Sequence, residues 1–148
     1  MGTLYKLEIP EEAEFPAMAE VWEASVRATH HFLKEEDIHF FKSLLLNEYF
    51  KLVDLFCVRN PEGVILGFMG VEGDKLEMLF IHPLMVGKGI GKEMLAYAME
   101  DLRVNKVDVN EDNQQAVGFY EKMGFKTIER SALDGMGKPF PILHMMIL

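Results

Sequence analysis

The stretch Val86-Gly87-Lys88-Gly89-Ile90-Gly91 places three glycines at alternate positions between a strand-like segment and a helical pattern. Because glycine has no Cβ, the chain there can adopt positive φ and a ligand can approach the backbone closely. The first N–H groups of a helix have no helical acceptor and attract an anion. Lys88 and Lys92 add positive charge on either side. The stretch therefore predicts a phosphate or pyrophosphate site at the start of a helix.

Two common phosphate loops do not fit this stretch. A Walker A loop needs Gly-x4-Gly-Lys-Ser/Thr, but Lys92 is followed by Glu93, and Val86 stands where the first glycine belongs. The dinucleotide fingerprint Gly-x-Gly-x-x-Gly has Lys92 at its last position, and it belongs after the first strand of a parallel sheet. From the loop alone, a glycine turn without ligand and a nucleotide-binding loop remain alternatives.

The chain before the loop predicts a strand, two helices and three antiparallel strands. The strand is expected over 4–9, the helices over 11–29 and 34–50, and the later strands over 52–59, 64–71 and 75–82. In the last of these, Leu76, Met78 and Phe80 are expected to share one face of the strand and Glu77 to lie on the opposite face.

The chain after the loop predicts a crossover and two further strands. A helix follows the loop, then a strand over 106–109 and a helix over 114–123, with Asn113 as N-cap and Gly124 after its last turn. Strands are expected over 125–130 and 142–148. We therefore predict an α+β fold, with a mixed, mostly antiparallel central sheet flanked by helices. Without repeats or linkers, residues 1–148 are expected to form one domain.

Composition limits the function. A net charge of -9 over 148 residues argues against a nucleic-acid partner and is compatible with a cationic amine substrate. No apolar run reaches the roughly 20 residues that cross a bilayer, and the start lacks the layout of a secretion signal. Cys57 is the single cysteine, and the five histidines show no HExxH pattern. We expect a cytoplasmic protein with neither a metal nor a membrane partner.

Four segments resemble the GCN5-related N-acetyltransferase (GNAT) superfamily. They are 79–83, 86–91, 110–113 and 116–125, and the last looks like the signature A-x-x-F-Y-x-x-x-G-F. A fifth, 22–33, is similar to a branch of small bacterial acetyltransferases. The resemblance implies an enzyme that transfers the acetyl group of acetyl-CoA, its cosubstrate, to a primary amine by direct attack in a ternary complex.

The resemblance also implies a cofactor site. In the family, the strand before the loop splays from its neighbour and offers backbone groups to the pantetheine arm, and the loop amides hold the pyrophosphate. The implied residues are Leu79, Phe80, Ile81, Val86, Gly87, Lys88, Gly89, Ile90, Gly91, Lys92, Asn110, Asn113, Ala116, Phe119 and Tyr120. Val86 departs from the family, which usually has Arg or Gln there, so we expect weaker but retained binding.

Acetyl transfer needs a neutral amine, help for the carbonyl oxygen and a proton for the sulfur of coenzyme A. The resemblance makes Tyr120 the acid, although it also reads as a core aromatic beside Phe119. The resemblance also makes Glu77 a candidate base acting through water, although it equally reads as an ordinary exposed strand residue. His30 is a second candidate, because the resemblance implies that the region after it lines the acceptor pocket, although a histidine at a helix end is more often structural. His144 is a weaker candidate.

The acceptor cannot be deduced from the sequence, and a small-molecule amine and a protein amine both stay open. A non-catalytic module that binds or senses acyl-CoA is the alternative to an enzyme. The apolar segment 142–148 is expected either at the centre of the sheet or against a partner chain, so the sequence also allows a homodimer.

Overall fold

A computed structural model describes residues 5–148, so Leu4, the first residue of the first predicted strand, lies outside the described residues. The elements of the described chain follow one another in the order β1 (Leu7–Glu8), η1 (Glu12–Glu14), α1 (Phe15–Thr29), α2 (Glu35–Asn47), η2 (Tyr49–Lys51), β2 (Asp54–Arg59), β3 (Ile65–Glu72), β4 (Lys75–Ile81), η3 (Pro83–Met85), α3 (Ile90–Glu100), β5 (Lys106–Asn110), α4 (Gln114–Lys122), β6 (Lys126–Ser131) and β7 (Ile142–Met146).

Within residues 5–148 the strands form one seven-stranded sheet in the order β1-β2-β3-β4-β5-β7-β6. Each neighbouring pair is antiparallel except β4 and β5, which are parallel because the crossover through α3 joins them. The α+β prediction is confirmed. β7 lies between β5 and β6, so the apolar C-terminal strand occupies the interior of the sheet and both its edges are paired within the chain.

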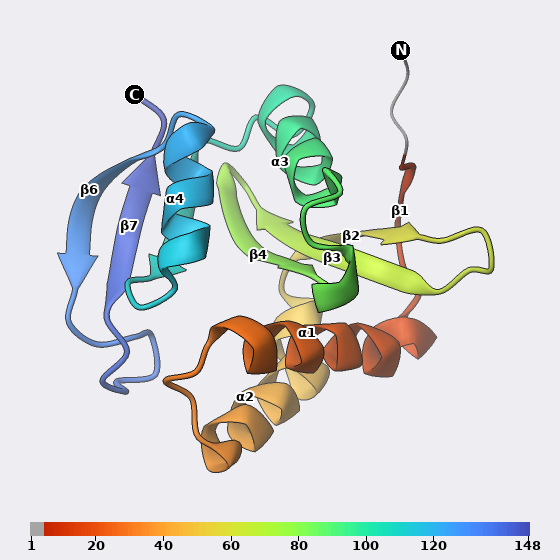
Figure 1. The fold of residues 1–148 in the computed structure, drawn as a ribbon, viewed down its shortest axis with the longest axis horizontal. Helices are drawn as coiled ribbons and strands as arrows, with labels where there is room; N and C mark the ends of the chain where they lie inside the picture. Colours follow the sequence, from red (N-terminus) through yellow and green to blue (C-terminus); the bar gives the residue numbers. More distant parts are fainter. Residues whose placement is uncertain (1–4) are drawn as a thin grey trace.

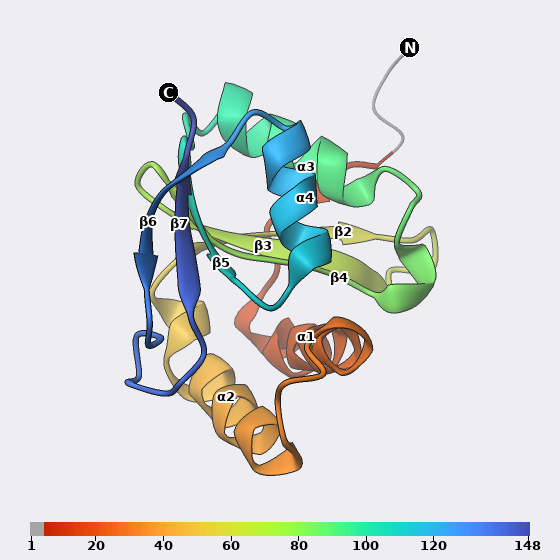
Figure 2. The same ribbon diagram turned by 60° about the vertical axis from the view of Figure 1, so that its left-hand side comes forward.

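Helices cover both faces of the sheet, α1 and α2 on one face and α3 and α4 on the other (Figures 1 and 2). Two separate cores follow from this arrangement. On the first face Met18, Trp22 and Val26 of α1 pack with Phe68 of β3. On the second face the packed residues include Met94, Leu95, Val107, Phe125 and Met145. Each predicted amphipathic helix therefore buries its apolar stripe against one side of the sheet.

The sheet is split between β4 and β5. In the described chain these strands pair only at Lys75 with Lys106 and at Leu76 with Val107. Beyond Leu76 they diverge, and the edge of β4 from Glu77 to Ile81 has no strand beside it on this side. Peptide groups left unpaired in this way need other hydrogen-bond partners, such as water or a ligand.

A β-bulge in β4 corrects one prediction. Gly70 pairs with Met78, but the next residue, Val71, pairs with Leu76, so Glu77 is an extra residue in β4. Leu76 therefore packs in the core beneath α3, whereas Met78 and Phe80 pack against the core beneath α1 and α2. The prediction that these three side chains share one face was wrong.

The other predicted elements are present with boundaries shifted by a few residues. The caps of α4 are confirmed, because the Asn113 side chain accepts a hydrogen bond from the Ala116 N–H at 3.3 Å and Gly124 has φ of 101°. The short helix Pro83–Met85 was not predicted, and the His82 ring supports it by accepting from the Leu84 N–H at 3.2 Å. None of the helices in residues 5–148 is both long and apolar enough to span a membrane.

Candidate active site

The glycine loop has the backbone that the sequence demands. Gly87 and Gly89 have φ of +85° and +87°, a conformation that side chains with a Cβ rarely adopt. Gly89 is the N-cap of α3, and the first hydrogen bond of the helix runs from the Glu93 N–H to the Gly89 carbonyl at 3.0 Å. The amides of residues 90–92 therefore have no helical acceptor and are available to an anion.

A cavity of about 430 Å³ lies beside this loop. Of the predicted cofactor residues, thirteen line it, namely Leu79, Phe80, Ile81, Val86, Gly87, Gly89, Ile90, Gly91, Lys92, Asn113, Ala116, Phe119 and Tyr120. Lys88 does not line the cavity, and Asn110 lies instead on a neighbouring pocket. Ser25 and Thr29 of α1 also line the cavity and were not predicted. Their spacing of four on one side of α1 was the available signal.

Tyr120 belongs both to the core and to the cavity. Its ring packs against Phe119 and Phe125, with centroids 5.2 and 5.7 Å away, and the side chain lines the cavity. Burial raises the pKa of the Tyr120 hydroxyl above its ordinary value, so the phenol stays protonated at neutral pH. Within the described chain this hydroxyl has no hydrogen-bond partner. It is therefore a free, neutral proton donor.

A narrow passage of about 90 Å³ follows the split between β4 and β5. Met78 and Phe80 line it from β4, and Asp108 and Asn110 line it from β5. Tyr120, which lines the cavity beside the loop, lines the passage as well. The split strands thus connect the cavity by the glycine loop with a larger pocket on the opposite face of the sheet.

His30 lies where the three spaces meet and lines all of them. It is 7% exposed, and burial, with a smaller effect from His31, lowers its pKa to about 4. The Thr29 hydroxyl donates to the Ser25 carbonyl at 2.9 Å and lies 2.7 Å from His30 Nδ1, which assigns the ring proton to Nδ1. Nε2 then faces the Asn113 amide nitrogen at 3.5 Å. His30 is a neutral ring that links α1 to the cap of α4.

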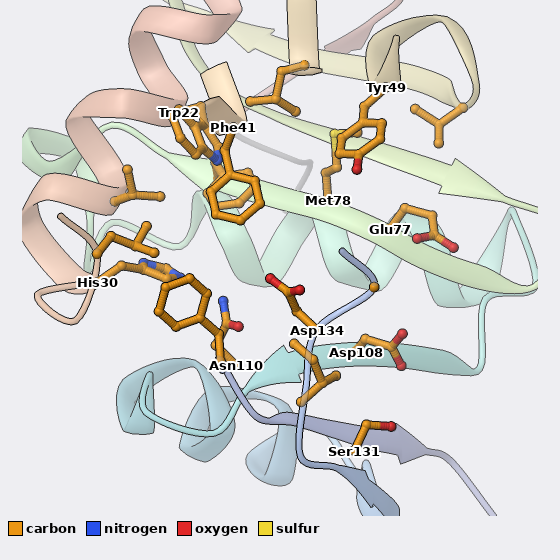
Figure 3. A pocket seen from close by; sticks show the side chains of 18 of the residues that line it. Trp22, His30, Phe41, Tyr49, Glu77, Met78, Asp108, Asn110, Ser131 and Asp134 are labelled. Atoms are coloured by element: carbon orange, nitrogen blue, oxygen red, sulfur yellow. The ribbon is translucent and has the colours of Figure 1, made fainter. Parts of the chain in front are cut away.

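The larger pocket has a volume of about 650 Å³ and lies between the helical layer of α1 and α2 and the strands β4, β5 and β7. Its aromatic wall comes from Trp22, Phe32, Phe41, Tyr49, Phe80 and Phe140. Carboxylates lie among these rings, namely Glu72, Glu77, Asp108 and Asp134. Figure 3 shows Trp22 and His30 at one end of the pocket and Glu77 and Asp108 at the other. An acidic, aromatic pocket suits an organic cation.

Glu77 and Met78 both line this pocket, which corrects the prediction that they point to opposite faces. The bulge at Glu77 is the physical reason, because the extra residue interrupts the alternation of side chains along β4. Glu77 lies 3.6 Å from the Lys75 ammonium, which also pairs with Asp108 at 2.6 Å.

A bound acyl-CoA fits these features. The exposed amides and positive-φ glycines suit a pyrophosphate, the cavity continues into the split, and the unpaired edge of β4 offers peptide groups to an extended amide-containing chain. No cluster of three or more His, Cys, Asp and Glu side chains suited to a metal occurs among residues 5–148. The fold and the two connected spaces define an acyl-CoA-dependent N-acyltransferase.

Comparisons with known proteins identify the family. The model of the acetyltransferase (GNAT) domain matches residues 26–138, and the chain belongs to this family. The peptidyl-lysine N-acetyltransferase YjaB of Salmonella typhimurium is 37% identical over 126 residues, which cover 85% of this chain and 86% of the relative.

Solved structures agree with this assignment. The solution structure of apo YjaB from Escherichia coli has a TM-score of 0.89 and 32% identity, with 99% of each chain covered. An N-acetyltransferase of Thermoplasma acidophilum in complex with coenzyme A shares the fold alone, with a TM-score of 0.73, 20% identity, and coverage of 99% of this chain and 100% of that one. The chain is thus an N-acetyltransferase that uses acetyl-CoA as its acetyl donor, and an enzyme rather than a binding module.

Proposed function

We propose that the acceptor is the ε-amino group of a lysine in a peptide or protein. The observation that carries this proposal is the 650 Å³ pocket, whose aromatic wall and carboxylates suit a long alkyl chain ending in an ammonium group. The relatives YjaB and YiaC of Escherichia coli are peptidyl-lysine N-acetyltransferases, which supports the same acceptor. The passage beneath this pocket supports a lysine that approaches from the face opposite the glycine loop.

The proposal gives the residues on the cofactor side distinct roles. Acetyl-CoA, when bound, supplies a thioester carbonyl as the electrophile. The amides at the start of α3 and the thirteen lining residues bind it, and a peptide N–H near Leu79 or Phe80 stabilises the developing negative charge on the carbonyl oxygen. Tyr120 donates its proton to the sulfur that leaves. Lys88 and Asn110 are retained as weaker, outer contributors.

Glu77 and His30 remain predictions for the acceptor side. Glu77 stands on the bulge with its carboxylate toward the pocket, which supports a role in attracting the ammonium group or in taking its proton through water. His30 is held neutral, and a ring with a pKa of about 4 is a weak base at pH 7. Its contact with Asn113 supports a role in positioning the N-cap of α4.

A peptide assay tests the acceptor. Acetyl-CoA and a panel of peptides that contain lysine, arginine or a free N-terminus are incubated with the enzyme, and the products are mapped by mass spectrometry. We expect acetylation at lysine side chains and none on arginine peptides with blocked N-termini. Preferred acetylation of a polyamine or of the N-terminal amine would reject peptidyl-lysine as the acceptor while leaving amine acetylation intact.

The proposal extends to the domain organisation, the cellular location and the oligomeric state of the chain. The uninterrupted pattern of elements supports one acetyltransferase domain over 1–148, and the bacterial relatives support a cytoplasmic location. A homodimer would have to form outside β7, whose two edges are paired within the chain. Light scattering after size-exclusion chromatography measures the oligomeric state.

A further inference from the structure

The acceptor pocket contains a histidine placed between a serine and an aspartate. His144 Nε2 lies 2.6 Å from the Ser131 hydroxyl, and His144 Nδ1 lies 2.8 Å from Asp108 Oδ1. The three residues come from the neighbouring strands β6, β7 and β5 and all line the 650 Å³ pocket. We infer that His144, oriented by Asp108, is the base that takes the proton of the acceptor ammonium.

The hydrogen bonds assign the protonation of this ring. A carboxylate accepts hydrogen bonds and cannot donate them, so the hydrogen between Nδ1 and Asp108 belongs to His144. Nε2 then carries a lone pair, and the Ser131 hydroxyl donates to it. This is the arrangement of a general base whose tautomer is set by an acidic partner. A substrate N–H that replaces the serine hydroxyl has an acceptor already oriented toward it.

The strand register gives this arrangement its rigidity. Asp108 and His144 are directly paired residues of two antiparallel strands, and such pairs project to the same face. Ser131 pairs with Ile142 on the other flank of β7, two residues from His144. Asp108 also lines the passage through the split, so the orienting carboxylate belongs to both the acceptor pocket and the route from the cofactor cavity. The base therefore rests on the sheet rather than on a loop.

Charged groups from several elements surround His144. Asp108 on β5 contacts it directly, and Lys75 on β4 pairs with the other oxygen of that carboxylate. Glu129 on β6 is paired with His144 in the register. The remaining charged groups that line the pocket are Glu72, Glu77 and Asp134. One ammonium among these carboxylates leaves an excess of negative charge, which attracts a cationic substrate.

The proposed step is balanced. The substrate ammonium gives one proton to His144 Nε2, directly or through one water, and becomes a neutral amine. Its nitrogen forms the C–N bond with the acetyl carbonyl carbon, and the C–S bond breaks. The nitrogen loses its second proton to water, Tyr120 gives its proton to the sulfur, and Tyr120 then regains a proton from water. His144 then releases its proton to water.

This inference rests on amine acetylation, and the test separates it from the choice of acceptor. kcat/KM is measured between pH 5.5 and 9 with acetyl-CoA and whichever amine gives thiol release, for the native chain and for H144Q, D108N, S131A, E77Q and H39Q. His39 is 74% exposed on α2, so H39Q controls for loss of a histidine far from the pocket. A lack of activity toward lysine peptides would count against that acceptor alone.

We expect H144Q to lose about a hundredfold in kcat/KM at pH 7.5, within the range of general base catalysis, and to lose the inflection of the pH profile that the native chain shows. D108N should also lower kcat/KM, because the ring loses the carboxylate that sets its tautomer. S131A should keep at least a third of the turnover and the same inflection. H39Q should match the native chain.

Three results would overturn the inference. If S131A abolishes turnover, the serine is a nucleophile and His144 serves it instead of the amine. If E77Q rather than H144Q removes the inflection, Glu77 is the base. Nitrogen NMR of the chain without substrates is the third readout, with His144 assigned by comparison with H144Q. We expect the neutral ring to carry its proton on Nδ1, and a proton on Nε2 would reject the hydrogen-bond assignment.

Discussion

The cavities on the two sides of strand β4 are built from different parts of the chain. On the side of α3 the cavity depends on backbone, with two glycines at positive φ and the free amides of a helix start. On the side of α1 and α2 the pocket depends on side chains, with aromatic rings and carboxylates from helices, strands and a loop. A site built from backbone requires a short, contiguous sequence motif, whereas a site built from side chains that lie far apart in the sequence has no such motif.

The largest effect is expected at Tyr120, the proposed acid in the cavity beside the glycine loop. Y120F should lower kcat by at least about a hundredfold, the scale of general acid catalysis. The dissociation constant for coenzyme A should change less than about threefold, because the proposed ligands of the phosphates are the amides and not the hydroxyl. Thiol release and calorimetry measure the two quantities. Y97F is the matched control, since Tyr97 packs against Phe56 away from the cavity. Equal losses in affinity and turnover would remove Tyr120 from the acid role.

His30 joins the two sides, and its burial predicts a pH dependence of stability. Its pKa is lowered from 6.5 to about 4 in the folded chain, so the unfolded chain binds a proton first as the pH falls. The free energy of unfolding is therefore highest above pH 6.5. It falls by up to about 3 kcal/mol as the pH is lowered from about 6.5 to 4. Urea unfolding at a series of pH values measures it.

H30Q should flatten that part of the curve, and H39Q should leave it unchanged because His39 is exposed. A native curve that H30Q leaves equally steep would place the titrating group elsewhere.

A substitution that strains the backbone of the glycine loop should have an intermediate effect. G89A forces a Cβ into a left-handed conformation, which costs about 1–2 kcal/mol and corresponds to about a tenfold weaker affinity for coenzyme A if the loop relaxes. G63A is the matched control, because Gly63 has φ of +86° in the hairpin turn between β2 and β3, far along the chain from the cavity. G63A should lower the melting temperature but keep the affinity. Unchanged affinity in G89A would show that the loop does not bind the phosphates.

The smallest effect is expected when a charged side chain is added to the cavity beside the glycine loop. Val86 lines the cavity and is 50% exposed, so V86R supplies the charged group that the family usually has there. We expect coenzyme A to bind about threefold to tenfold more tightly at low salt, with the gain reduced by added salt. V64R, at another exposed valine, controls for the change in net charge.

The local geometry of the cavity beside the glycine loop was predicted from the sequence because each of its features depends on neighbouring residues. Glycine at positive φ, a helix start and the N-cap Asn113 are each specified by neighbouring residues. The bulge at Glu77 was not predicted, because it depends on how β4 meets Gly70 and Val71 of β3. The contact of His144 with Asp108 and Ser131 needs the register of three strands, two of which, β6 and β7, are joined by a long loop. In the sequence His144 therefore stands as an isolated histidine on the last predicted strand, without visible partners.

The split in the sheet has a consequence for the lifetime of the protein. Strand edges are normally found at the rim of a sheet, whereas this chain carries one in the middle, along β4. A ligand that completes this interior edge binds the folded chain alone and raises its stability, by about 2.7 kcal/mol at a hundredfold excess over the dissociation constant. Resistance to proteolysis should therefore follow the supply of acetyl-CoA, so that the enzyme persists longest when its substrate is abundant.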